Sequence, residues 1–216
     1  MNRRKEQIEA LLKHAAEHDW QSCREALFRV LYDGLPANVQ LSLAGFAIQR
    51  FLPIFENKWP NITWPATLLR DPSEWLTRHG RSLPDEPPDP DPADAAFIFT
   101  FDALLLASNY QTDALILTSS CAAAVGSAIN ARQCAVWMAD DPEGVAMWRR
   151  QGYFPGRSLA QSKPAIAVAE REWEATAVWL SARTEWIEAE AAPAEEIERN
   201  LARWREHEMS LIVPRS

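Results

Sequence analysis

The sequence predicts an all-α protein, and three observations favour that class. The 216 residues include only seven glycines, about half the usual share of roughly 7%, whereas sheet proteins need glycine in their turns. Apolar residues recur at helical spacing along most of the chain. Three Asp-Pro pairs supply the N-cap and the first residue typical of helix starts. We therefore expect a single domain over residues 1–216, built from about eight or nine irregularly stacked antiparallel helices.

The first two helices are expected to form a tight αα-hairpin. An apolar stripe runs through residues 6–18, and Asp19 is a suitable N-cap for a second helix that stops at Gly34. The second helix places five apolar side chains on one face, namely Trp20, Cys23, Leu27, Val30 and Leu31. A connection this short favours antiparallel packing of the two helices.

The next segment, residues 36–56, is apolar on two faces, which is typical of a helix that lies between neighbours. Pro53 should kink or end this helix, because proline has no N–H to donate and its ring clashes with the preceding turn. Residues Ile54 to Trp59 are then expected to form a loose turn.

The three Asp-Pro pairs predict three further helices. They begin after Asp71, Asp91 and Asp141, and they are expected over about 72–79, 92–108 and 142–151. The first has Glu74 at N3, as in a capping box, and Gly80 after its end.

The second half of the chain adds the remaining helices. Residues 112–139 predict one small-residue helix or a pair, and the run Cys121 to Gly126 lacks bulk, so a neighbouring helix could approach it closely. The pattern from Lys163 to Ala191 predicts a long helix, and Pro193 begins a last one. The apolar-biased run within 112–139 carries too many hydroxyl and amide groups for a membrane span, so we expect a buried central helix and no membrane contact.

Residues 82–92 form a Pro- and Asp-rich loop that should be extended and stiff. A calcium site is disfavoured because prolines take the alternate positions and glycine is absent. The loop is either a solvated acidic segment, a docking site for a basic partner, or, less favoured, a boundary between two halves. As a docking site it would use the carboxylates of Asp85, Glu86, Asp89 and Asp91, which the prolines should hold away from the body.

Two tryptophans, Trp59 and Trp64, lie in a second proline-containing stretch, after Pro53. Tryptophan is more often a core residue than a binding residue, but an indole held on an irregular segment can anchor a partner. We therefore add Trp59 and Trp64 to the candidate partner-binding residues.

The string His14-Ala-Ala-Glu17-His18 matches the H-x-x-E-H motif of inverted zinc metallopeptidases, in which both histidines bind zinc and the glutamate is the general base. Glu86 is a conceivable third ligand. The context favours a polar helix edge instead, with His18 near a helix end where a cation is favourable. His79 and His207 have the same interpretation, and we expect neither a metal nor a cofactor.

Other catalytic signals are weak. Asp102 interrupts an apolar helix, either as a buried acid with a raised pKa or as a residue that is paired with an arginine such as Arg132 or Arg70, or simply hydrated. The chain has no G-x-S-x-G motif and no glycine-rich phosphate loop. The three cysteines form no C-x-x-C motif, and they are interpreted as buried, inert thiols in a reducing compartment. They are Cys23, Cys121 and Cys134.

The net charge limits the classes of molecule that the protein is expected to bind. A formal charge of −8 and a pI of about 5.1 disfavour nucleic acid, which needs a basic surface, and allow a basic protein partner. The basic N-terminus runs into an amphipathic pattern without the apolar region of a signal peptide, so we expect a cytoplasmic protein.

The string Leu52-Pro53-Ile54-Phe55-Glu56, followed by Trp64-Pro65, Leu68-Leu69, Trp75 and the Ala-rich run from Ala114 to Ala139, resembles a family of helical immunity proteins from bacterial polymorphic toxin systems. The resemblance covers about residues 40–140. It implies a non-enzymatic protein that binds and blocks a cognate toxin in the cytoplasm. The acidic charge of the chain fits a toxin that is basic, as many nuclease toxins are. Two other hypotheses stay open: a helical adaptor or chaperone linked to secretion, and a small enzyme with an unrecognised site.

Overall fold

The computed structural model describes residues 3–33, 35–84, 87–151 and 156–188, and within these ranges it contains eleven α-helices and no β-strand. The all-α class is therefore confirmed, whereas the expected number of about eight or nine helices is too low. The helices, in chain order, are α1 (Arg3–Ala16), α2 (Trp20–Tyr32), α3 (Ala37–Gln49), α4 (Leu52–Lys58), α5 (Trp64–Arg70), α6 (Pro72–His79), α7 (Pro92–Asn109), α8 (Ala114–Asp140), α9 (Pro142–Gln151), α10 (Gly156–Gln161) and α11 (Lys163–Glu188).

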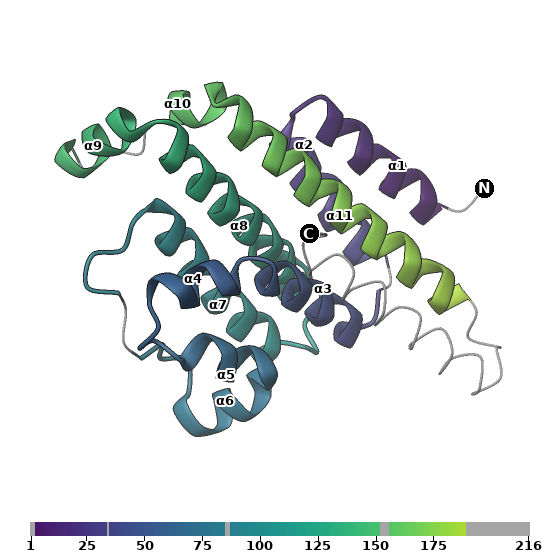
Figure 1. Ribbon diagram of the computed structural model, residues 1–216. Coiled ribbons are helices and arrows are strands. Elements are labelled where there is room, and N and C mark those ends of the chain that lie inside the picture. The colour runs from purple at the N-terminus through teal and green to yellow at the C-terminus, as the bar shows by residue number, and fades with distance from the viewer. Residues whose placement is uncertain (1–2, 34, 85–86, 152–155, 189–216) are drawn as a thin grey trace, which may run out of the picture.

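The longest helix, α8, is the centre of the arrangement (Figure 1). It packs antiparallel against α7 and also contacts α2, α3 and α11. The α1–α2 hairpin lies against α11, and the short helices α4, α5 and α6 gather around α7. Helix α9 projects from the end of α8, away from the other helices.

The expected hairpin between α1 and α2 is present, but α1 ends at Ala16, two residues before His18. His18 has a φ of 58°, which is the left-handed conformation. Its N–H donates to the Ala15 carbonyl, and the Asp19 N–H donates to the His14 carbonyl, each at 3.0 Å. These two bonds form a Schellman motif. Asp19 then caps α2 by accepting a hydrogen bond from the Ser22 N–H at 3.1 Å.

The predicted loose turn after Pro53 is wrong. Helix α3 ends at Gln49, and a new helix, α4, begins at Leu52 with Pro53 in its first turn. A first-turn N–H has no partner within its own helix, so proline is tolerated there. The same argument explains α5, where Pro65 follows the first residue, Trp64. Helices α4 and α5 thus account for most of the difference between the expected eight or nine helices and the eleven in the described residues.

Helix α8 is one continuous helix of 27 residues, which decides between the expected single helix and pair. It is long and apolar enough to pass a length-and-composition test for a membrane span, but 61% of its most apolar stretch is buried against the rest of the protein. Such burial is typical of the core helix of a globular protein. The expected last helix after Pro193 lies outside the described residues.

A buried ion triad connects three helices at the centre of the fold. Glu172 on α11 is 5% exposed, and it accepts two hydrogen bonds from the Arg50 guanidinium, at 2.5 and 2.9 Å. Arg132 on α8 lies 3.2 Å from the same carboxylate and also donates to the Arg50 carbonyl at 3.2 Å. Burial lowers the pKa of Arg132, while the Glu172 carboxylate opposes that shift. Because Arg50 is the C-cap residue of α3, the triad links the end of α3 to α8 and α11.

Candidate functional site

The acidic loop does not present all of its carboxylates to solvent. Asp91 is 7% exposed, and its side chain is paired with the Lys58 ammonium, which also bonds to Asp94 at 2.5 Å. Asp91 and Asp94 form a reciprocal capping box at the start of α7. The expectation that the prolines hold Asp91 away from the body is therefore wrong, because helix capping and an ion pair draw it inward.

Of the other three predicted docking carboxylates, only Asp89 lies in the described part of the loop, and it is exposed. Asp85 and Glu86 lie outside the described residues. Of the predicted docking carboxylates, Asp89 is the one that the described part of the loop places at the surface, and one exposed carboxylate contributes little to recognition.

The two candidate anchor tryptophans also differ. Trp64 is 7% exposed, and its ring contacts Phe101 and Trp75 at centroid distances of 5.0 and 6.4 Å, so it is a core residue. Trp59 is half-buried, and the Lys58 ammonium lies 5.2 Å from its ring centre. Lys58 thereby connects Trp59 to Asp91, two features that are far apart in the sequence.

The arrangement of His14 and His18 does not match a zinc site. His18 lies beyond the end of α1, so the two histidines do not occupy successive turns of one helix. His14 Nδ1 lies 3.6 Å from a carboxylate oxygen of Glu17, and His18 Nε2 lies 3.5 Å from one of Glu170. Within the described ranges, no group of three His, Cys, Asp or Glu side chains is placed to hold a metal. Glu86 and His207 lie outside those ranges.

The remaining catalytic candidates are the three cysteines, which are buried, and Asp102, which is exposed. Burial raises the pKa of each of the three cysteines, Cys23, Cys121 and Cys134, to about 12. A thiol with such a pKa stays protonated and is a poor nucleophile. Asp102 is exposed and is not a buried acid, and Arg132, one of its expected partners, belongs to the Glu172 triad.

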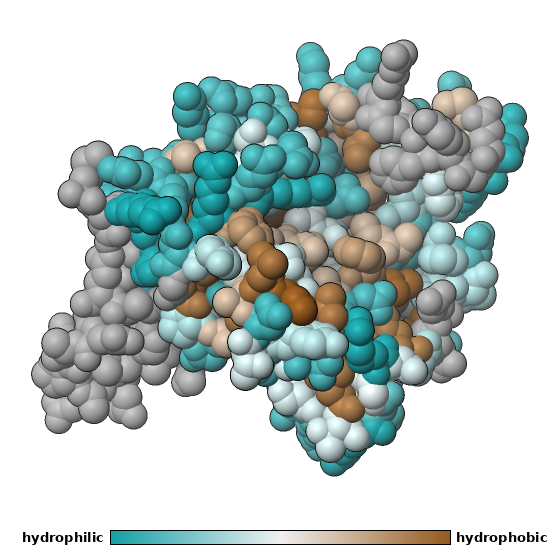
Figure 2. All heavy atoms as spheres, turned by 180° about the vertical axis from the view of Figure 1, so that it is seen from behind, coloured by the Kyte–Doolittle hydropathy of each residue, from teal (hydrophilic) through white to brown (hydrophobic). Residues whose placement is uncertain are grey.

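The most distinctive surface feature is a groove between α2 and α7, with α8 as its floor. Its volume is about 500 Å³. Helix α2 lies behind α11 in Figure 1, and the view from behind in Figure 2 shows hydrophobic side chains gathered across the middle of the surface. The lining residues are Arg24, Glu25, Phe28 and Arg29 from α2, Phe99 from α7, and Ser119, Ala122, Ala123 and Ser127 from α8. We call this the α2–α7–α8 groove.

The floor of the groove consists of small side chains. Ser119, Ala123 and Ser127 are four residues apart, so they lie on one face of α8. Among the described residues that line the groove, those from α8 are all alanine or serine, so α8 leaves the space between α2 and α7 open. The signal for this floor in the sequence was the lack of large side chains in residues 121–126. We had expected a neighbouring helix of the same chain to approach them.

Large apolar side chains form the walls. Phe99 is 54% exposed despite lying in the most apolar part of α7. On the α2 side, Phe28 stacks on Tyr32 with ring centroids 5.7 Å apart and an interplanar angle of 11°. Sequence periodicity did not single out Phe99, because apolar residues surround it on both sides in α7 and no single apolar stripe stands out.

The rim of the groove carries both signs of charge. The Arg24 side chain lies across α8 so closely that a Cβ built on Gly126 would be 3.1 Å from its Nε. Glu25, beside it, accepts a hydrogen bond from the Gln21 amide at 3.1 Å. An apolar centre with a polar rim is the usual construction of a protein-binding surface.

The described structure thus defines a helical protein with an apolar surface groove. Comparison with protein-family models, with curated proteins and with solved structures found no match in any of the three.

Proposed function

We propose that this chain is a non-enzymatic protein-binding domain, and that its α2–α7–α8 groove receives an amphipathic helix of a basic partner protein. The observation that carries the proposal is the exposed Phe99 beside a floor of Ser119, Ala123 and Ser127. Apolar surface rimmed by polar residues is typical of interaction sites. A groove between two helices suits the helix-in-groove mode, in which apolar residues one turn apart enter the groove.

Charge and residue chemistry support this class of partner. The chain has a net charge of −8, which favours encounter with a basic protein over an acidic one. Mixed charges at the rim, Arg24 and Glu25 among them, would fix the register of the bound helix. Small residues on α8 would let the partner's backbone come close, while Phe99 supplies a large contact area.

The most concrete form of this function is a cytoplasmic immunity protein that binds and neutralises a cognate bacterial toxin. The support for that form is the resemblance over about residues 40–140 together with the acidic charge. A helical adaptor or chaperone linked to secretion is the alternative, and it would bind several client proteins where an immunity protein binds one.

Affinity capture from the source cells tests the proposal with two groove variants and one control. Ala123→Arg fills the floor and Phe99→Ala removes the wall, while Ala139→Arg places the same bulk and charge on an exposed position of the same helix. We expect the wild type and Ala139→Arg to retain one basic protein that both groove variants lose. With purified partner, the dissociation constant should rise at least about tenfold in the groove variants.

Growth assays then test the immunity form. Coexpression of the wild type should protect cells that produce the captured partner, and Ala123→Arg should not. Equal partner affinity of the wild type and both groove variants would refute the groove as the binding site. Capture of many unrelated proteins would favour the chaperone alternative.

A further inference from the structure

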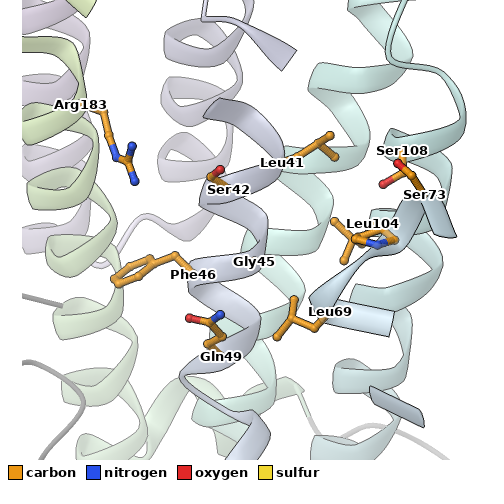
Figure 3. A pocket seen from close by; sticks show the side chains of 11 residues that line it. Leu41, Ser42, Gly45, Phe46, Gln49, Leu69, Ser73, Leu104, Ser108 and Arg183 are labelled. Carbon is orange, nitrogen blue, oxygen red and sulfur yellow. The ribbon is translucent and has the colours of Figure 1, made fainter. Parts of the chain in front are cut away.

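A second pocket lies across the outer face of α3 and shares no lining residue with the α2–α7–α8 groove. It has a volume of about 380 Å³ and is bordered by α5, α6, α7 and α11. Figure 3 shows Gly45 of α3 near its middle, with Arg183 on one side of the helix and Leu104 and Ser108 on the other. We call this the α3 pocket.

Gly45 has no structural requirement to be glycine. It lies in the interior of α3, where glycine is less favourable than alanine. A Cβ built at this position would have Leu69 Cδ1 as its nearest side-chain neighbour, at 3.7 Å, which is an ordinary van der Waals contact. The missing side chain therefore does not serve packing. Its effect is to keep the middle of the α3 pocket open, as expected where stability is given up for function.

Ser108 provides a second, independent observation. The residue is 8% exposed, and its hydroxyl oxygen is buried without a hydrogen-bond partner among the described residues. Several other helix hydroxyls in this protein bond to a carbonyl of their own helix, for example Ser42 to Asn38 at 2.7 Å and Thr176 to Glu172 at 2.9 Å. Burying an unpaired hydroxyl is unfavourable. Because Ser108 lines the α3 pocket, a ligand there could accept its hydrogen bond.

The lining indicates the chemistry of that ligand. Leu41, Leu69 and Leu104 give an apolar surface on the α7 side, and Ser42 and Gln49 add polar groups along α3. Such a mixture suits a peptide, whose backbone needs hydrogen bonds and whose side chains need apolar contacts. A pure hydrocarbon chain would leave the polar groups unpaired.

Charge is provided at one side of the pocket. Arg183 lines the α11 side, and its guanidinium lies 4.7 Å from the centre of the Trp179 ring, a cation–π distance. An arginine fork is well suited to a carboxylate. A helix with side chains is about 10–12 Å wide, and three extended residues span about 10 Å. A short peptide can therefore reach from Arg183 across Gly45 to Ser108.

We propose that the α3 pocket binds the C-terminal end of a short apolar peptide, with the terminal carboxylate beside Arg183 and a peptide carbonyl accepting a hydrogen bond from Ser108. The proposal is independent of the groove, because the two sites share no lining residue and lie on different helices apart from α7.

Nitrogen-15 NMR titration of the full chain tests it with three probes. The first is acetyl-Ala-Leu-Val with a free carboxylate, the second is the same peptide as its C-terminal amide, and the third is decanoate. We expect saturable binding of the acid and about tenfold weaker binding of the amide, since the charge-assisted bond is lost. Decanoate should bind more weakly than the peptide acid.

Variants locate the site. Ser108→Ala should weaken binding of the peptide acid about fivefold and Arg183→Gln about tenfold. Gly45→Ala should weaken binding while raising the melting temperature, so its effect cannot be misfolding. Ser82→Ala and Arg149→Gln, at exposed positions outside the pocket, are the matched controls and should bind as the wild type does.

Several results would overturn the proposal. They are the absence of saturable binding at about 10 mM peptide acid, equal affinity for acid and amide, tighter binding of decanoate, and affinities that the pocket variants leave unchanged.

Discussion

Replacing Glu172 by Gln keeps the size of the side chain but removes the negative charge between Arg50 and Arg132. Breaking a buried ion pair by removing one partner costs about 3–5 kcal/mol. Glu172 is 5% exposed at its side chain, while Arg50 and Arg132 are 15% and 28% exposed and keep some access to water. We therefore expect the lower end of the range, a loss of about 3 kcal/mol in the free energy of unfolding. For a chain of this size the melting temperature should fall by roughly 6–12 °C.

Urea unfolding at neutral pH measures this loss. Glu174→Gln is the matched control, because Glu174 is exposed on the same helix and should change stability by less than about 0.5 kcal/mol. Adding Arg132→Met to Glu172→Gln should recover part of the stability, since one uncompensated charge is removed. Equal stability of Glu172→Gln and Glu174→Gln would show that the triad contributes nothing to the free energy of unfolding.

Three further predictions follow from the described contacts. The three cysteines have pKa values raised to about 12 by burial, so at pH 8 they should react with a disulfide reagent no faster than the chain unfolds; rapid labelling of the native protein would contradict their burial. His18→Gly should raise the free energy of unfolding by about 0.5–1 kcal/mol, and with it the melting temperature, because His18 has a φ of 58° that glycine adopts without strain. An unchanged or lower melting temperature would contradict this prediction. Asp91→Ala should lower the free energy of unfolding by about 1–3 kcal/mol, because the helix cap and the ion pair with Lys58 are lost. Asp89→Ala, at an exposed position, should change it by less than about 0.5 kcal/mol. Equal effects of the two substitutions in urea unfolding would show that the loop carboxylates are equivalent.

Local signals in the sequence were sufficient for the all-α class and for most helix boundaries. Asp71 and Asp91 cap the helices that they were expected to cap, and Gly80 follows α6 with a positive φ of 64°. These features depend on the conformation of a few consecutive residues, so they can be predicted without knowledge of the rest of the fold.

Proline was the ambiguous signal. At Pro53 the absence of an N–H predicted the end of a helix, but the structure uses the same property at the beginning of α4. Either outcome is compatible with the residue alone. The choice depends on whether the residues after Pro53 find apolar neighbours, and Phe55 does, since its ring packs 4.9 Å from that of Phe97.

The candidate sites were decided by tertiary structure. Asp91 is drawn into the protein by Lys58, which is 33 residues away in the sequence. Glu172 meets Arg50 across 122 residues. A carboxylate in a proline-rich loop or on a helix has the same local pattern whether it is paired or hydrated, so periodicity and capping rules do not distinguish the two states.

The sequence by itself determined that this protein is helical, where several of its helices begin, and that residues 121–126 of α8 permit a close approach. Only the tertiary structure decided that Phe99 lies 54% exposed beside that face and that Trp64 is buried. The physical reason is that helical periodicity specifies which residues share a face, while exposure depends on which other helix covers that face. On α7, neighbouring helices cover Phe97 and Phe101, whereas Phe99 is left exposed at the α2–α7–α8 groove.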